Sequence, residues 1–313
     1  MPIITGTVYD DAGLPSTNRI VRAYRRDTGA LLQSTLSATA QAGDPLYGDV
    51  NLLLLGEDLT GTNSTSIIDT SSFARTVTPV GGIALDYTKW KFAQSSILFD
   101  GVNDYLQLDN ISAYNLGSIN FCIEFWYWHP STKGGRIYSG GEHGGSIWPI
   151  NEIKAGTDGS IAWLINYANS NTYTTLSSGA ASTIANAWNH VVCNREGNIF
   201  RIFINGVKKA EVTWANSFYV PPTGPRIGCY FNSSVPSDFL TGSINSFRFT
   251  RNNPRYSADF TPPTQRFANS LSILTDGGFT LNTGTYTGEA NVLFLDDTPG
   301  TVYNDIVHRT IVS

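Results

Sequence analysis

Hydrophobic and polar side chains alternate with a period of two along much of this chain, which is the spacing of a β-strand. Residues 121–127 carry bulky side chains on both faces and predict a central strand. Three further stretches are joined by the turn sequences Glu-Gly-Asn and Asn-Gly and predict a meander: residues 187–194, 199–204 and 207–212. Helical periodicity is hard to find, so the pattern predicts an all-β chain.

The two ends of the chain carry the same pattern in shorter form. Turn residues separate six alternating stretches, at residues 3–10, 19–26, 30–34, 279–281, 289–295 and 301–312. The first forty residues hold too few apolar side chains to offset the entropy cost of folding alone. We therefore expect residues 1–40 and 270–313 to form one small split β-sandwich, with residues 41–269 inserted as a second domain.

Composition agrees with this picture and excludes several partners. Aromatic residues make up 12% of the 313 residues and charged residues only 14%, which favours short strands over charged helices. The net charge of −5 is scattered without a basic run, so we expect no nucleic-acid partner. The longest apolar run, Leu52 to Leu55, is too short to span a membrane, and the first residues do not resemble a secretory leader.

The three cysteines, Cys122, Cys193 and Cys229, lie in apolar, strand-like contexts. Their odd number is unlike a disulfide framework, and none has a second Cys or a His at metal-ligand spacing. We expect them to be buried thiols.

Several motifs in a fixed order identify the middle of the chain as similar to a known family. They are Asn51–Gly56, Ser96–Leu106, Phe121–Tyr127, Ala187–Val192, Phe203–Gly206, Thr241–Phe249, Pro254–Tyr256 and Phe260–Pro263. Together they resemble the laminin-G-like, concanavalin A-like lectin/glucanase domain. The resemblance implies a jelly-roll β-sandwich for residues 41–269.

The chain ends carry a second resemblance. Ile4–Val8 and Val21–Gly29 at one end, with Tyr286–Glu289 and Asp296–Asp305 at the other, resemble the carboxypeptidase-regulatory or transthyretin-like module. That module is an immunoglobulin-like β-sandwich found on phage structural proteins. The two resemblances together imply a concanavalin A-like jelly roll inserted into a small immunoglobulin/transthyretin-like β-sandwich.

The same resemblance implies a structural protein of a bacteriophage particle, assembled in the host cytoplasm and present in multiple copies that form a homo-oligomer by the symmetry of the particle. We expect a capsid decoration protein whose lectin-like domain projects outward and adheres weakly to glycans. The small sandwich would dock on other virion proteins through Arg22, Arg25 and Arg26. One alternative is a tail receptor-binding protein that recognises a host-surface polysaccharide, and another is a polysaccharide depolymerase.

Candidate glycan-binding residues gather in one long loop and three later segments. The loop 139–152 carries Glu142, His143 and Trp148, and we expect Tyr173, Tyr230 and Asp238, with Tyr167, to lie near it. Aromatic faces stack on the C–H surfaces of sugars, and carboxylates accept hydrogen bonds from sugar hydroxyls. The alternative is that these aromatic side chains belong to the core, as most do in all-β chains.

Signals of catalysis and metal binding are weak. Glucan hydrolases of the resembling fold use an E-x-D-x-x-E strand, whereas Glu124 has no second carboxylate two or four positions away, so we expect no enzyme. His190 is expected to support the hairpin core rather than to catalyse.

A calcium site is the one metal site that the resemblance suggests. Asp100, Asn103 and Asp104 would supply a weak one, although a turn-forming role is favoured for them. Ile244-Asn245-Ser246 replaces the paired acids of relatives in the closing strand, which removes two anionic ligands. We therefore expect no cofactor.

Overall fold

The computed structural model describes two separate units built from strands. Side chains are described for residues 43–57, 66–92, 95–109, 112–131, 134–142, 151–166, 173–218 and 223–269, and backbone alone for residue 111 and for strands at 3–7, 20–25, 31–36, 278–282, 289–295 and 307–310. The only helices among these residues are two 3-10 turns, η1 (Tyr47–Asp49) and η2 (Ile111–Tyr114). The all-β prediction is therefore confirmed. No described helix has the length and apolar character needed to cross a membrane.

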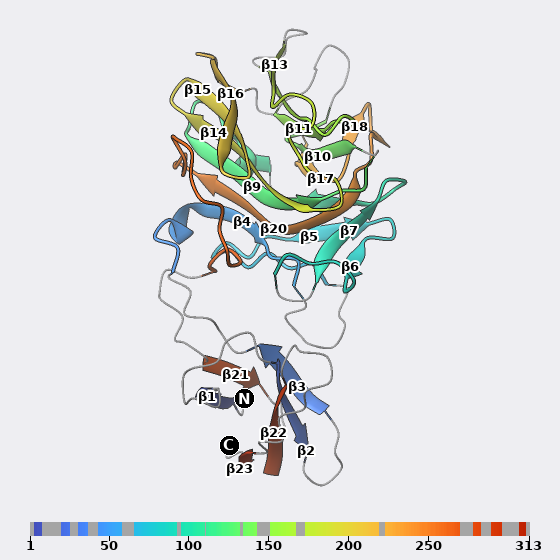
Figure 1. The fold of residues 1–313 in the computed structure, drawn as a ribbon, viewed down its shortest axis with the longest axis vertical. Coiled ribbons are helices and arrows are strands. Elements are labelled where there is room, and N and C mark those ends of the chain that lie inside the picture. The colour runs from blue at the N-terminus through green and yellow to red at the C-terminus, as the bar shows by residue number, and fades with distance from the viewer. Residues whose placement is uncertain are drawn as a thin grey trace. The chain divides into compact units, whose positions relative to one another are not determined.

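By its backbone contacts the chain divides into Met1–Pro45 with Asp58–Thr65 and Ser270–Ser313 as one unit, and Leu46–Glu57 with Ser66–Asn269 as the other. The first unit pairs strands from both chain ends (Figure 1). Its strands are β1 (Ile3–Thr7), β2 (Ile20–Arg25), β3 (Leu31–Leu36), β21 (Gly278–Asn282), β22 (Glu289–Leu295) and β23 (Val307–Thr310). Strand β1 pairs with β21, and the other four follow the order β23-β22-β2-β3. Membership of the immunoglobulin/transthyretin-like class stays a prediction.

The second unit is a sandwich of two antiparallel sheets. The seven-stranded sheet has the order β13-β12-β11-β10-β17-β8-β5. Its strands are β5 (Val77–Val80), β8 (Tyr105–Leu108), β10 (Gly135–Ser139), β11 (Glu152–Ala155), β12 (Ile161–Asn166), β13 (Tyr173–Ser177) and β17 (Arg226–Ile227). A separate hairpin, β18 (Tyr230–Asn232) with β19 (Val235–Ser237), follows β17 in the chain.

The eight-stranded sheet has the order β16-β15-β14-β9-β20-β7-β6, with β4 also paired to β20. Its strands are β4 (Val50–Leu54), β6 (Ala84–Asp86), β7 (Ser96–Asp100), β9 (Phe121–Trp128), β14 (Trp188–Glu196), β15 (Ile199–Ile204), β16 (Val207–Thr213) and β20 (Thr241–Arg251). Strand β9 lies between β14 and β20, and β14, β15 and β16 form a meander. The central strand and the three-strand meander that the sequence predicts are both confirmed.

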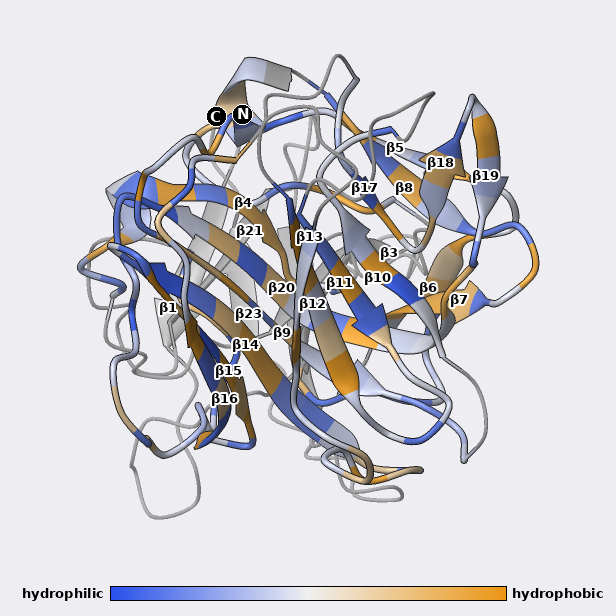
Figure 2. Cartoon of the chain, turned by 90° about the horizontal axis from the view of Figure 1, so that it is seen from above, coloured by the Kyte–Doolittle hydropathy of each residue, from blue (hydrophilic) through white to orange (hydrophobic). Residues whose placement is uncertain are grey.

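The main core lies between the two sheets. Hydrophobic and hydrophilic residues alternate along the strands of the sandwich (Figure 2), so each sheet presents one apolar face inward. On β9, Phe121 and Phe125 are fully buried, and the Phe121 ring meets Trp163 of the opposite sheet edge-on, with ring centroids 5.8 Å apart. The three cysteines are buried and form no disulfide, as the sequence predicts.

The outer face of the eight-stranded sheet is also covered, by the segment that follows β20. Tyr256 and Phe260 of this segment pack on Cys122 and Phe203, and Phe267 packs with Trp126. Because β9 therefore has covered surfaces on both sides, all but one of its residues are buried. We call residues 252–267 the covering segment.

Candidate functional site

The outer face of the seven-stranded sheet carries a polar row that runs across all its strands. Residues paired directly in an antiparallel sheet project to the same face, and Ile153, Ile227 and Leu106 face the core. The residues next to them along each strand therefore face outward. In the order of the strands from β13 to β5, the row consists of Thr175, Leu164, Glu152, Ser139, Arg226, Gln107 and Thr78, all of them polar except Leu164.

Arg136 is the centre of a charged cluster on this face. Its Nη1 lies 3.1 Å from Oε2 of Glu152, and its Nη2 lies 3.4 Å from Oδ2 of Asp238. Lys154 Nζ approaches the same Asp238 oxygen at 3.1 Å. The Arg136 guanidinium also lies 4.8 Å from the ring centroid of Tyr230. Arg136 and Glu152 are buried although they lie outside the sandwich core, so their mutual pairing offsets the cost of removing both charges from water.

Glu142, which follows β10, is bonded to the turn of the β18–β19 hairpin. Its backbone N–H donates to Oγ1 of Thr223 over 2.9 Å. Its Oε1 accepts hydrogen bonds from the backbone N–H of Ser234 and, over 2.9 Å, from the Ser234 hydroxyl. Ser234 lies in the turn between β18 and β19, whereas Tyr230 begins the hairpin and Asp238 follows it. The hairpin thus contacts Glu142 at its turn and Arg136 at its base.

Four residues around the same cluster have positive φ values. The φ values of these residues lie in the region that residues other than glycine rarely adopt: 110° for Asn151, 50° for Ser233, 67° for Ser234 and 54° for Asp238. Asn151 is fixed by its Oδ1, which accepts a 2.6 Å hydrogen bond from Nε1 of the buried Trp163.

The structure brings together three of the six predicted glycan-binding residues, namely Glu142, Tyr230 and Asp238. Tyr173 lies on the edge strand β13, opposite Asn166, with 44% of its surface exposed, and contributes no contact to the cluster. His143 and Trp148, with Tyr167, lie outside the described residues, as does Arg26. Arg22 and Arg25 lie on β2. Glycan binding by the six predicted residues stays a prediction, and so does docking by the three arginines.

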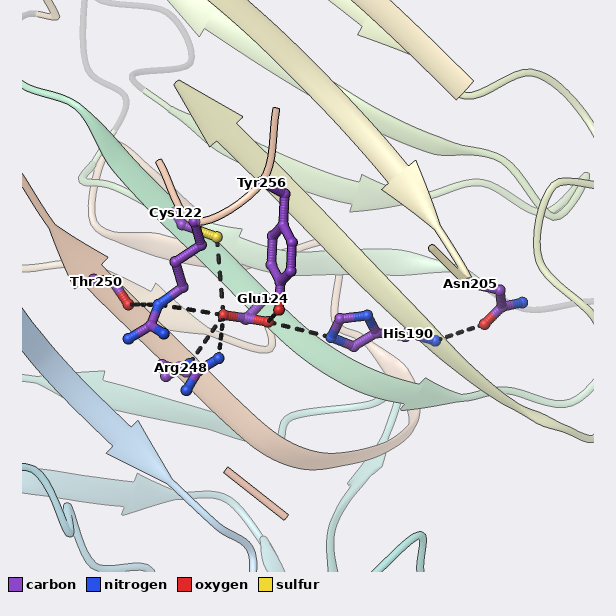
Figure 3. Close-up of polar contacts among 8 residues, drawn as sticks. Cys122, Glu124, His190, Asn205, Arg248, Thr250 and Tyr256 are labelled. Atoms are coloured by element: carbon purple, nitrogen blue, oxygen red, sulfur yellow. Dashed lines mark hydrogen bonds and ion pairs between the residues drawn. The ribbon is translucent and has the colours of Figure 1, made fainter. Parts of the chain in front are cut away.

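The most extensively paired carboxylate of the sandwich is Glu124, on the other sheet (Figure 3). Its Oε1 accepts hydrogen bonds from Arg248 Nε and Nη2 over 2.9 and 2.7 Å. Its Oε2 accepts a 2.9 Å hydrogen bond from the Tyr256 hydroxyl and lies 3.3 Å from Nε2 of His190. Arg255 Nε lies 3.6 Å from Oε1.

Burial alone would raise the pKa of Glu124, but the charges of Arg248 and Arg255 and the contact with His190 outweigh it, and the pKa lies far below its ordinary value. Tyr256 and Arg255 belong to the covering segment, so this ionised carboxylate ties that segment to β9. His190 is buried, as expected of a hairpin-core residue, and its backbone N–H donates to Oδ1 of Asn205 over 2.8 Å. The contacts of Glu124 and His190 therefore indicate a structural role: they help to hold the covering segment on the eight-stranded sheet.

The carboxylates proposed for calcium are engaged in turns. Asp100 Oδ1 accepts from the backbone N–H groups of Val102 and Asn103 over 2.7 and 3.3 Å. Asp104 accepts from the N–H groups of Gly82 and Asp100 over 2.6 and 3.1 Å. Across the residues with described side chains, no group of three or more His, Cys, Asp or Glu is arranged to hold a metal ion.

Asn245 of β20 has a structural role. Its Nδ2 donates to the carbonyls of Leu55 and Ser95 over 2.8 and 3.0 Å, and its Oδ1 accepts from the backbone N–H of Phe92 over 3.1 Å. A carboxylate at this position would lose both donated bonds. The amide therefore joins three segments of backbone, a role that an acid would not fill.

Residues 100–255 match the family described as the concanavalin A-like lectin/glucanases superfamily. The chain therefore contains a concanavalin A-like lectin/laminin G domain, and its two antiparallel sheets form the β-sandwich of that class. No curated protein gives a significant match to the sequence.

Solved structures with a similar fold include binding domains of botulinum neurotoxins. The serotype D domain is 15% identical, with a TM-score of 0.47, over 70% of this chain and 50% of that one. A binding domain of botulinum neurotoxin DC in complex with SialylT is 14% identical, with a TM-score of 0.46, over 72% and 50%. The chain thus spans about half the length of these domains. The Ruminococcus gnavus IT-sialidase CBM40 bound to α2,3-sialyllactose is 13% identical, with a TM-score of 0.41, over 47% of this chain and 81% of that one.

Proposed function

We propose that this chain is a non-enzymatic, lectin-like protein that binds a glycan on the outer face of the seven-stranded sheet. The observation that carries the proposal is that Tyr230 and Asp238 both contact Arg136, while Glu142 is hydrogen-bonded to Ser234 in the turn of the same hairpin. Carboxylate oxygens accept hydrogen bonds from sugar hydroxyls, and a tyrosine ring supplies a surface for the C–H groups of a sugar. Asp238 is 29% exposed, so its carboxylate is open to solvent while its position is fixed by Arg136 and Lys154.

The proposal that the site is not catalytic is supported by the ion pairs that its two carboxylates form with Arg136. Glu152 and Asp238 are the two acids beside Arg136, and the same guanidinium forms an ion pair with each. Retaining and inverting glycosidases need one carboxylic acid to protonate the leaving group. An arrangement that holds both acids as ion-paired carboxylates suits binding. Release of reducing ends from a bacterial polysaccharide by the purified chain would contradict this and favour a depolymerase.

We further propose that the protein is part of a bacteriophage particle, where it decorates the capsid and the unit formed by the chain ends attaches it. Support comes from the sequence resemblance of both chain ends to modules of phage structural proteins. Docking by Arg22 and Arg25 of β2 belongs to the same proposal. The alternative is a tail protein that recognises a host polysaccharide. Antibody labelling of intact particles, imaged by electron microscopy, separates the two: label on the capsid supports decoration, label on the tail supports receptor binding, and unlabelled particles contradict both.

The glycan-binding proposal predicts that Asp238→Asn weakens binding about tenfold or more, because a hydrogen bond to a charged group contributes about 1.5–3 kcal/mol. Wild type and variant are compared on an array of bacterial and host glycans, followed by titration calorimetry with the best ligand. Glu196→Gln is the matched control, since Glu196 is also a partly exposed carboxylate paired with an arginine, Arg201, but lies on the other sheet. Equal loss in both variants, or no loss in Asp238→Asn, would place the ligand elsewhere.

A further inference from the structure

Arg226 is a second buried arginine on the outer face of the seven-stranded sheet. It lies on the two-residue strand β17, where its register partners are Ser139 on β10 and Gln107 on β8. Ile227, the next residue, points into the core, so the Arg226 side chain points outward among the polar row. Only 6% of its surface is exposed. A positive charge is thus held almost out of water, on the face that we propose binds a glycan.

The Arg226 guanidinium lacks the compensation that its neighbour Arg136 has. Arg136 forms ion pairs with Glu152 and Asp238. Among the residues whose side chains are described, no carboxylate lies within ion-pairing distance of Arg226, and its Nε has no hydrogen-bond partner. Its Nη1 donates only to the carbonyl of Gly224, over 3.2 Å. A buried charge without a counter-ion is costly, so the site is electrostatically incomplete.

The surroundings of Arg226 fix the orientation of its guanidinium. The Arg226 guanidinium carbon lies over the Phe231 ring of β18, 3.7 Å from the ring centroid. Because the ring covers one face of the guanidinium, an anion would bind to the N–H groups in its plane. The charge of Glu142 reaches Arg226 only through space, because the Glu142 carboxylate is held by the Ser234 hydrogen bonds of the hairpin. Burial lowers the pKa of Arg226, and the electrostatic effects of Cys229, Glu142 and Tyr105 offset that shift only in part.

We propose that Arg226 binds a carboxylate of an acidic sugar, so that the ligand of this face is an anionic glycan. The inference rests on the proposed function and specifies its ligand class. The planar guanidinium fork matches the two oxygens of a carboxylate, and the buried Nε without a hydrogen-bond partner lies on the edge that pairs with a carboxylate side-on. Gln107 and Ser139 flank the position in register. A uronic or sialic acid residue would supply the missing negative charge, and the sugar ring would extend toward Tyr230 and Asp238.

The test is an array on which each acidic oligosaccharide is printed beside its carboxyl-reduced counterpart, which is neutral but otherwise unchanged. We expect the wild-type chain to bind at least one acidic member tenfold or more better than its reduced partner. Arg226→Gln should lose this preference while it retains binding to the neutral partner, and Arg226→Lys should retain part of it because lysine keeps the charge without the fork. Arg201→Gln, which removes an arginine from the other sheet, should keep the full preference.

The outcomes distinguish the two proposals. Binding of neutral and acidic partners with equal strength would overturn the role of Arg226 and leave glycan binding standing. Absence of binding to every glycan would overturn both proposals. A preference for acidic members that survives in Arg226→Gln would assign the carboxylate to another cation. Since the wild-type comparison of each acidic glycan with its reduced partner needs no variant, poor folding of Arg226→Gln, monitored by its thermal unfolding, does not remove the test.

Discussion

Glu124→Gln is expected to lower the free energy of unfolding of the sandwich by about 3–5 kcal/mol, because removal of one partner from a buried ion pair leaves the other charge uncompensated. The glutamine keeps the shape of the side chain but not its charge, so Arg248 and Arg255 would remain buried without a counter-ion. Tyr256 would lose a charged acceptor, and with it one of the contacts that hold the covering segment on β9.

Tryptophan fluorescence during urea unfolding measures this change in one unit alone, since all seven tryptophans lie between residues 90 and 214 and none lies in the unit made by the chain ends. The control is Glu211→Gln, which removes an exposed carboxylate paired with Arg201 and Lys208. Exposed ion pairs contribute at most about 1 kcal/mol, so the control should change little. Equal losses of stability in the two variants would contradict the stabilising role of the buried Glu124 ion pairs.

The pH dependence gives a second check on the same residue. The pKa of Glu124 in the folded chain lies below its ordinary value of 4.5, so the unfolded chain takes up a proton first as the pH falls. The stability that Glu124 contributes is therefore complete above about pH 4.5 and is lost as the pH drops toward its folded pKa. The difference between wild type and Glu124→Gln should shrink below pH 4.5. A difference that stays constant from pH 7 to pH 3 would contradict the ion-pair explanation.

The central strands of the sandwich could be predicted from the sequence because they are long and regularly alternating. Strand β9 and the meander of β14, β15 and β16 lie where the pattern places them. Strand β17 could not be found this way, since it has only two residues and owes its existence to pairing with β8 and β10, far away in the chain. The β18–β19 hairpin was hidden for another reason: its turn uses two serines with positive φ instead of the Asn-Gly sequence that marks such turns.

The site was predictable only where residue type alone suggests a binding role. Glu142, Tyr230 and Asp238 suggest glycan chemistry by residue type, but Arg136 and Glu152 resemble ordinary surface charges in the sequence. A β-bulge between Arg136 and Tyr138 places Arg136 and Ser139 on the same face although they are three positions apart, which simple alternation does not allow. On the other sheet, a register shift between Asn245 and Arg248 likewise brings Arg248 opposite Glu124. Charge partners set by such irregularities emerge only from the fold.

Trp163→Ala is expected to lower the free energy of unfolding of the sandwich by about 3–5 kcal/mol, the usual cost of removing a large aromatic side chain from a core. Trp163 is fully buried, with its ring 5.8 Å from that of Phe121 and 5.2 Å from that of Phe200, measured between centroids. The variant also removes the hydrogen bond that fixes Asn151 in its strained conformation. Glycan affinity should therefore fall even where the variant is folded.

Trp163→Phe separates the two effects of that substitution. Phenylalanine keeps most of the buried ring but cannot donate to Asn151, so the free energy of unfolding should fall less than in Trp163→Ala while the loss of glycan affinity persists. Trp90→Ala is the control for removal of an indole, because Trp90 is 45% exposed and should cost far less stability. Urea unfolding and titration with the same glycan measure both quantities. Unchanged affinity in a folded Trp163→Phe would show that the Trp163 hydrogen bond to Asn151 does not organise the outer face of the seven-stranded sheet.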